Sequence, residues 1–380
     1  MATFHGYVHV PFCRVRCGYC DFNTYTATEL DGYPQSAFLG NLAKEIELAL
    51  PETRDRKLST VFFGGGTPTL LPAEELAEAL RLLENAYGFE PNAEITTEAN
   101  PDTVDARYLD TLRSAGFNRI SFGMQSAVPE VLKMLDRTHN PAAVARNVSV
   151  AKRLGFEVSV DLIYGAPGET MGQWQESVYA ALEMESNHIS AYALILEPGT
   201  KLARAVASGV VPEPDEDLQA DKYEWLDKTL SEHGFDWYEL SNWSRSKQTA
   251  SFHNIAYWQG MDWWGFGPGA HSHIGGKRWA NVKHPTTYAK HLAANKLPTT
   301  ERELLGEEAR LEERAMLELR LVAGLDLDVV RQLNSESSKA VSSLIAEGLI
   351  DGAKAIAGRA VLTLRGRLLA DFVLRRLLGL

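Results

Sequence analysis

The feature that most constrains the fold is a repeated alternation of short, β-branched apolar runs with longer segments of helical periodicity. Parallel strands covered by crossover helices have this pattern. We expect six strands: YVHVP from Tyr7, TVFFG from Thr60, AEITTEA from Ala93, NRISFG from Asn118, EVSVDLIYG from Glu157 and ISAYALIL from Ile189. Such units can build a closed barrel, a partial barrel or a doubly wound sheet. Six units favour the α/β class with a partial (β/α)6 TIM-like barrel.

Changes in composition divide the rest of the chain. A chain of 380 residues that is 45% hydrophobic can bury a large core. We expect the partial barrel over residues 1–235, an aromatic-rich extension over 236–300 and a C-terminal helical accessory domain over 301–380. Seven of the eight tryptophans lie between Trp225 and Trp279. The last segment predicts three or four helices and one short strand at 360–364, so it resembles a small winged-helix-like domain.

Charge and cysteine content exclude several classes of protein. A net charge of −12, without a basic stripe near the C-terminus, argues against nucleic acid as a partner. The sequence has no signal peptide and no run of 18 apolar residues, so we expect no transmembrane segment. All three cysteines lie between positions 13 and 20, which excludes a disulfide framework and predicts a reducing, cytoplasmic location.

The three cysteines form a C-x3-C-x2-C motif, Cys13, Cys17 and Cys20, directly after the first predicted strand. This spacing can place three thiolates on three corners of a [4Fe–4S] cubane, which leaves one iron open to an exchangeable ligand. Arg14 and Arg16 would help to keep the thiolates ionised. The alternatives are a zinc ion held by the cysteines and His9, or thiols without a metal. We favour the cluster, because zinc knuckles usually contain two C-x2-C pairs.

Polar and glycine residues recur at the carboxyl ends of the predicted strands, where parallel βα folds bind ligands. The turn Gly64-Gly-Gly-Thr-Pro68 follows the second strand, and its backbone can approach a ligand closely because Gly64, Gly65 and Gly66 have no Cβ. Glu98 ends the third strand, Gln125 ends the fourth, Arg137 follows in the next helical segment and Asp161 lies in the fifth strand. These groups suit a zwitterionic ligand rich in hydroxyls. The alternative for each of them alone is a structural hydrogen bond.

These motifs together resemble the radical-SAM enzymes of the oxygen-independent coproporphyrinogen III oxidase family, and most closely its haem-chaperone members. The motifs are Tyr7-x-His9-x-Pro11-x-Cys13, the cysteine loop, Gly64-Gly-Gly-Thr-Pro68 and Asp161-Leu-Ile-Tyr-Gly165. The resemblance implies a radical-SAM fold in which Cys13, Cys17 and Cys20 bind the cluster. It implies that S-adenosylmethionine (SAM) contacts Tyr7, Gly65, Gly66, Thr67, Glu98, Gln125, Arg137 and Asp161, with Tyr19 near the adenine.

Two departures separate this chain from the oxidase. The oxidase has another cysteine two positions after the third, where this chain has Phe22, and it has an N-terminal extension where this chain has six residues before Tyr7. The haem-chaperone members instead carry a His-Asn-x-x-Tyr-Trp element, found here as His253-Asn-Ile-Ala-Tyr-Trp258. The sequence therefore favours a chaperone over a decarboxylating enzyme.

The resemblance makes His253, Asn254, Tyr257 and Trp258 candidates for binding haem, with His253 as axial ligand. The aromatic side chains of Trp243, Phe252 and Trp264 would complete the walls of the site. The turn Gly265-Phe-Gly-Pro-Gly269, with His271 and His273, would shape the same cavity. The alternative is an ordinary aromatic core in which His253 is a buried, hydrogen-bonded histidine.

We therefore expect a haem chaperone that binds haem and a SAM-liganded [4Fe–4S] cluster and transfers haem to an acceptor protein. The alternative is a coproporphyrinogen III oxidase that decarboxylates propionates by radical chemistry, and a third class is a zinc-stabilised regulatory protein. The expected partners are haem or a related tetrapyrrole, an acceptor protein and an electron donor. The sequence identifies neither the acceptor nor catalytic residues.

Overall fold

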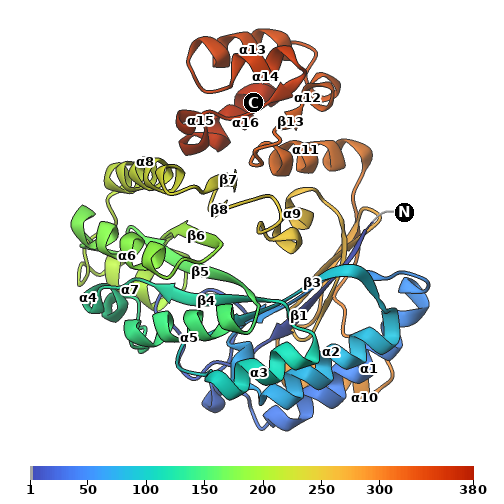
Figure 1. The fold of residues 1–380 in the computed structure, drawn as a ribbon. Coiled ribbons are helices and arrows are strands. Elements are labelled where there is room, and N and C mark those ends of the chain that lie inside the picture. Colours follow the sequence, from blue (N-terminus) through green and yellow to red (C-terminus); the bar gives the residue numbers. More distant parts are fainter. Residues whose placement is uncertain (1–2) are drawn as a thin grey trace.

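A computed structural model describes residues 3–380 and contains the six predicted βα units in order (Figure 1). The strands are β1 (Phe4–Val10), β2 (Leu58–Gly65), β3 (Phe89–Ala99), β4 (Arg119–Gln125), β5 (Glu157–Tyr164) and β6 (His188–Ala193). They pair in parallel from β1 to β6. The helices between and after them are α1 (Phe38–Thr53), α2 (Ala73–Tyr87), α3 (Ala106–Ala115), α4 (Pro129–Met134), α5 (Pro141–Arg153), α6 (Met171–Glu183) and α7 (Lys201–Ala207). The predicted partial (β/α)6 barrel is confirmed, although β6 ends before the predicted Leu196.

Each barrel strand alternates between a face that packs under the helices and a face that lines the barrel. In β5, Val158, Val160 and Leu162 belong to the main hydrophobic core. Ser159 and Asp161, between them, point the other way. The same inner face carries His5, Tyr7 and His9 from β1, Thr60 from β2, Glu94, Thr96 and Glu98 from β3, Arg119 and Ser121 from β4, and His188, Ser190 and Tyr192 from β6. The barrel interior is therefore polar.

Residues 236–304 extend the barrel sheet at both of its edges. Strand β9 (Asp262–Phe266) pairs in parallel with β1, and beyond it lie β10 (His271–Ile274), β11 (Lys277–Ala280) and β12 (Glu303–Leu304). At the other edge β8 (Asn242–Ser244) pairs antiparallel with β6, and β7 (Asp236–Glu239) follows it. In the described part of the chain the twelve-stranded sheet runs from β12 to β7 without closing. The barrel and the aromatic-rich segment thus share one sheet.

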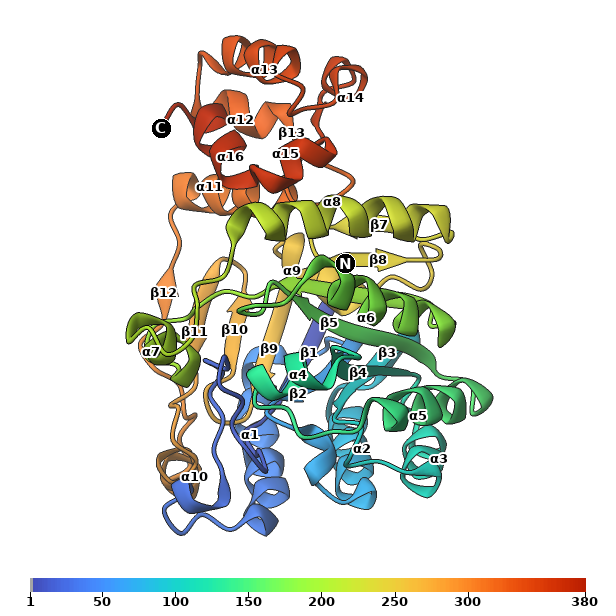
Figure 2. The ribbon, with the colours of Figure 1, turned by 90° about the vertical axis from the view of Figure 1, so that its left-hand side faces the viewer.

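Three further helices accompany these strands. They are α8 (Glu216–Glu232), α9 (Phe252–Trp258) and α10 (Pro285–Ala293). Helix α8 begins after Asp215, whose side chain caps it by accepting a hydrogen bond from Leu218 N at 3.0 Å. Figure 2 shows α8 between α6 of the barrel and the C-terminal helices.

The C-terminal region has its own hydrophobic cluster, which includes Leu319, Leu344 and Leu377. Its elements are α11 (Glu307–Glu318), β13 (Leu325–Asp326), α12 (Leu327–Leu333), α13 (Ser337–Ala346), α14 (Gly352–Ile356), β14 (Arg359–Ala360), α15 (Leu364–Leu368) and α16 (Ala370–Leu378). The predicted strand at 360–364 is shorter than expected. Thr363 ends the extended segment because its side chain caps α15, with Gly366 N donating at 3.0 Å. Within residues 3–380, no helix combines the length and apolar character needed to cross a bilayer.

Candidate functional site

The three cysteines lie on the loop that follows β1 at its carboxyl end, and all three are partly buried. Backbone hydrogen bonds hold the loop: Cys13 N donates to Tyr25 O at 3.0 Å, and Cys20 N donates to Cys17 O at 3.1 Å. Over residues 3–380, no three His, Cys, Asp or Glu side chains are grouped as the ligands of a single metal ion. A [4Fe–4S] cubane does not need such a close group of ligands, because each thiolate binds a different iron at a separate corner of the cluster.

The environment of the thiols suits a positively charged group. Burial is the main reason that the pKa of Cys20 rises to about 11 and that the pKa of Cys13 is also raised. A thiolate in this place therefore needs compensating charge, which iron supplies when it coordinates sulfur. Arg137 provides a cation from the protein, because its Nη1 lies 3.5 Å from Cys17 Sγ.

The expectation that Arg14 and Arg16 keep the thiolates ionised is not supported. Arg14 is exposed, and Arg16 turns toward Glu29, with an Nη2–Oε1 distance of 3.4 Å. Arg137 takes this place instead, since its Nη2 also donates to Gly123 O at 3.0 Å and its Nε is buried without a hydrogen-bond partner in the described residues. An unsatisfied guanidinium N–H beside the cysteines can bind a carboxylate.

The glycine turn after β2 packs against the cysteine loop. Gly65 has φ 105°, and a Cβ there would lie 2.5 Å from His9 Cε1. A Cβ on Gly66 would lie 2.5 Å from Phe12 O. Thr67 N donates to the same carbonyl oxygen at 2.7 Å. Glycine is therefore needed at positions 65 and 66 because the two loops approach each other too closely to leave room for a side chain.

Glu98 and Asp161 lie on the inner face of the barrel toward the cysteine loop. Burial and, to a smaller extent, the neighbouring Asp161 carboxylate together raise the pKa of Glu98 to about 8. Ser121 Oγ lies 2.9 and 2.8 Å from the two carboxylate oxygens of Asp161. Burial also raises the pKa of Tyr7, which lies near Glu98 and whose hydroxyl is 2.9 Å from His9 Nδ1. Two carboxyl groups and a phenol thus converge inside the barrel.

Tyr192, Ser121 and Ser190 belong to this inner face and were missed in the sequence. Tyr192 is 45% exposed and lies near Asp161. The available signal was the alternation of polar residues in β4 and β6, which places these side chains on the inner face with Asp161.

Gln125 and Tyr19 complete the predicted SAM contacts. Gln125 ends β4 with φ 61°, a left-handed conformation that a residue with a side chain rarely adopts. The strand register shifts between Gly123 and Gln125, so the amide leaves the regular alternation. Tyr19 lies beside Cys17 and Arg137, and burial raises the pKa of its phenol. All predicted SAM contacts therefore belong to β1–β5 or to the segments at their carboxyl ends.

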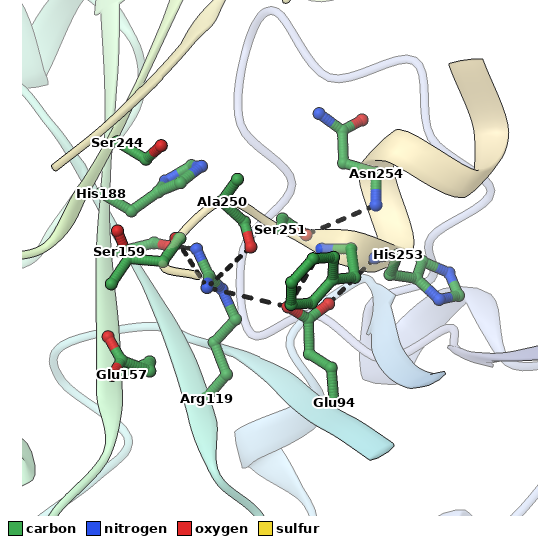
Figure 3. A network of polar contacts seen from close by, with 12 residues as sticks. Glu94, Arg119, Glu157, Ser159, His188, Ser244, Ala250, Ser251, His253 and Asn254 are labelled. Carbon is green, nitrogen blue, oxygen red and sulfur yellow. Dashed lines mark hydrogen bonds and ion pairs between the residues drawn. The ribbon is translucent and has the colours of Figure 1, made fainter. Parts of the chain in front are cut away.

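The predicted haem element lies at the opposite, amino end of the barrel strands. It forms α9, whose first N–H groups are bound by one buried carboxylate: Phe252 N donates to Glu94 Oε2 at 3.0 Å and His253 N donates to Oε1 at 2.9 Å. Arg119 pairs with Glu94 at 3.7 Å and donates to Ser159 Oγ at 3.1 Å. Figure 3 shows this network, which fixes α9 across the barrel floor.

His253 is buried, and both of its ring nitrogens have partners. Nδ1 lies 2.6 Å from Thr60 Oγ1 and Nε2 lies 2.9 Å from the Tyr257 hydroxyl. Its ring stacks on Phe62, with centroids 5.2 Å apart. Burial lowers the pKa of His253 well below its usual value, so the ring is neutral. Trp258 differs, because its indole N–H is buried without an acceptor among residues 3–380.

Two of the other aromatic residues expected around His253, Trp243 and Trp264, do not lie there, whereas Phe252 precedes His253 in α9 and is exposed. Trp243 is buried against Tyr223 of α8 and donates to Asp227 Oδ1 at 2.9 Å. Trp264 is buried against Trp279, on the other edge of the sheet. They point to opposite flanks because β8 and β9 join opposite edges of the sheet.

The chain is similar to known proteins over its whole length. Residues 7–178 match the radical SAM superfamily. Heme chaperone HemW of Mycobacterium tuberculosis is 47% identical over 377 residues, which cover 99% of this chain and 95% of that protein. Heme chaperone HemW of Bacillus subtilis is 32% identical, with 98% of both chains covered.

Among solved structures, the coproporphyrinogen III oxidase HemN of Escherichia coli, a radical SAM enzyme, has a TM-score of 0.84 at 24% identity. The match covers 99% of this chain and 90% of the oxidase. At this identity the likeness establishes the fold. The full-length similarity to the chaperones establishes more: the chain belongs to the heme chaperone HemW family of radical SAM proteins.

Proposed function

We propose that this chain is a haem chaperone that binds haem and a SAM-liganded [4Fe–4S] cluster and transfers haem to an acceptor protein. The observation that carries the proposal is the 47% identity to heme chaperone HemW across 99% of this chain. That match includes α9 and the C-terminal region as well as the barrel. As a radical SAM protein, the chain uses a [4Fe–4S] cluster and SAM.

In this proposal Cys13, Cys17 and Cys20 are the cluster ligands. Their position on one loop, the buried surroundings of Cys13 and Cys20, and the Arg137 guanidinium 3.5 Å from Cys17 support the assignment. When bound, the cluster supplies an electron to SAM at its open iron. The loop and the glycine turn pack together and limit the access of water to the thiolates.

The proposed SAM contacts are Tyr7, Tyr19, Gly65, Gly66, Thr67, Glu98, Gln125, Arg137 and Asp161. Thr67 Oγ1 lies 3.9 Å from Cys13 Sγ, which puts the glycine turn next to the proposed cluster. Glu98 and Asp161 can accept from ammonium or ribose hydroxyl groups, and the unsatisfied Nε of Arg137 can donate to a carboxylate.

The proposed haem contacts are His253, Asn254, Tyr257 and Trp258. A neutral imidazole is the form that coordinates iron, and the unpaired indole N–H of Trp258 can donate to a propionate. The Tyr257 hydroxyl is hydrogen-bonded to His253 Nε2. In this proposal His253 must break this hydrogen bond before Nε2 can coordinate the haem iron.

The competing activity, decarboxylation of coproporphyrinogen III, is tested directly. The anaerobically reconstituted protein is incubated with SAM, a strong reductant and coproporphyrinogen III, and the tetrapyrroles are then separated by chromatography. We expect unchanged substrate together with saturable haem binding in a parallel titration. Formation of protoporphyrinogen would overturn the proposal in favour of an oxidase. Phe22, 63% exposed where the oxidase carries a further cysteine, supports the chaperone.

The cluster assignment is tested separately with Cys17→Ser, which should abolish stoichiometric iron and sulfide. Retention of both would remove Cys17 from the ligand set. The proposal also includes a cytoplasmic location, an electron donor and an acceptor protein. The location is supported by the confinement of all three cysteines to one proposed cluster motif.

A further inference from the structure

Glu45 of α1 is a fully buried carboxylate with three neutral hydrogen-bond donors. Gly267 N donates to Oε2 at 2.7 Å, Tyr288 OH donates to Oε2 at 2.6 Å, and Asn281 Nδ2 donates to Oε1 at 2.6 Å. These donors are more than 200 residues away in the sequence and come from the turn after β9, from the segment after β11 and from α10. One carboxylate thus joins α1 to three parts of the 265–288 segment.

The turn that Glu45 binds, Gly265–Gly269, lies against the cysteine loop. A Cβ on Gly267, where φ is 97°, would lie 2.4 Å from His9 O. A Cβ on Gly269 would lie 2.3 Å from Asn23 Nδ2. The turn was expected to shape the haem cavity, but these close approaches place it behind the cysteine loop. Its glycines are required there because any side chain would push the two segments apart.

Asn23, three residues after Cys20, fastens the loop to this turn. Its Nδ2 donates to Pro268 O at 3.0 Å and to Lys283 O at 2.9 Å, and its backbone oxygen lies 2.9 Å from His9 Nε2. Displacement of the turn would therefore be transmitted to the end of the loop that carries Cys20.

We propose that Glu45 is a positioning residue for the cluster: it fixes the Gly265–Gly269 turn, against which Asn23 and His9 hold the cysteine loop. The inference rests on the proposed assignment of Cys13, Cys17 and Cys20 as cluster ligands. Glu45 acts only through the turn and takes no direct part in coordination. Residues that orient metal ligands commonly change metal affinity by roughly 10–100-fold when they are replaced.

The test compares the reconstituted parent protein with Glu45→Gln and with a matched control, Asp227→Asn. Asp227 also accepts three hydrogen bonds, two from Arg367 and one from Trp243, but it lies at the junction of α8 with the C-terminal region. The measurements are iron and sulfide per chain, the rate of cluster loss to a chelator, and the electron paramagnetic resonance spectrum of the reduced cluster with and without SAM.

We expect Glu45→Gln to lose its cluster roughly tenfold faster than the parent and to show an altered spectrum. Asp227→Asn should lower the unfolding temperature but leave the rate and spectrum unchanged. If Glu45→Gln does not fold, Tyr288→Phe, which removes one donor, replaces it and should show the same trend. The inference would be overturned if Glu45→Gln, or Tyr288→Phe in its place, folds and shows the same rate of cluster loss and the same paramagnetic resonance spectrum as the parent. A parent without iron and sulfide would instead contradict the cluster assignment itself.

Discussion

His253 Nε2 lies 2.9 Å from the hydroxyl of Tyr257, one turn further along α9. The same imidazole binds Thr60 of β2 through Nδ1. The histidine of the haem element is therefore held inside the barrel by two hydrogen bonds, and the proposed coordination of haem iron would require one of its ring nitrogens to give up its partner. Substitutions in this pair can separate the two roles.

We expect Tyr257→Phe to bind haem at least as tightly as the parent, because the change frees Nε2 and keeps an aromatic ring. His253→Gln should lose the axial ligand and weaken haem binding by roughly tenfold or more, the usual size of the loss of one charged or metal contact. Anaerobic haem titration, followed by the Soret absorbance, measures both. Equal weakening in the two variants would indicate a shared structural role, and unchanged binding by His253→Gln would exclude it as ligand.

The left-handed backbone of Gln125 predicts that substitutions at this position change the stability of the protein and its affinity for SAM in different ways. Its φ of 61° is costly for a residue with a side chain, of the order of 1 kcal/mol, and glycine relieves this cost. We therefore expect Gln125→Gly to unfold at higher denaturant concentration than Gln125→Ala. Both variants should bind SAM more weakly than the parent, because both lack the amide. Tight SAM binding by Gln125→Ala would show that the amide makes no contact.

The C-terminal region is joined to the barrel by a buried ion pair. Arg367 of α15 donates to both carboxylate oxygens of Asp227 at 2.8 and 2.6 Å, and its guanidinium lies 4.4 Å from the centroid of the Trp237 ring. We expect Asp227→Ala to cost about 3 kcal/mol, since it leaves a buried guanidinium without its partner.

Urea unfolding measures this loss. Glu347→Ala, which removes an exposed carboxylate that pairs with Arg376, is the control and should destabilise the protein far less, because solvent screens an exposed pair. Similar losses in the two variants would show that the junction does not depend on the buried pair.

The raised pKa of Glu45 predicts that the free energy of unfolding depends on pH. Burial raises its pKa from 4.5 to about 7, against the opposing effects of Tyr288, Gly267 and Asn281. Because the folded pKa lies above the unfolded one, the folded state binds the proton more tightly. This contribution to stability is complete below about pH 4.5 and is lost as the pH rises through 7.

Between pH 5 and pH 8 the parent should therefore lose stability relative to Glu45→Gln, by an amount of the order of 2–3 kcal/mol. The difference between the two unfolding curves isolates Glu45, because Glu98 and the other titrating groups are common to both proteins. Parallel pH profiles would show that the carboxyl does not change its protonation on folding in this range.

The sequence predicted the six barrel strands closely, because their apolar runs and the helical segments between them are local patterns. It also predicted the cysteine loop at the carboxyl end of the first strand and the partial barrel. The C-terminal strand was predicted too long, since the competing cap made by Thr363 for α15 was not recognised. Ser121, Ser190 and Tyr192 were not recognised as part of the inner face, because the outward apolar residues dominate each run.

The sequence by itself determined the βα repeat, the family and the candidate ligands, since each is written in short motifs or in full-length similarity. The tertiary structure decided which cation accompanies Cys17, where α9 lies and what the Gly265–Gly269 turn touches. Arg137 replaces the neighbouring Arg16 beside the thiol, and Glu45 reaches Asn281 across 236 positions of the sequence. Such pairs form only when distant strands are brought into register, so no local pattern of residues can encode them.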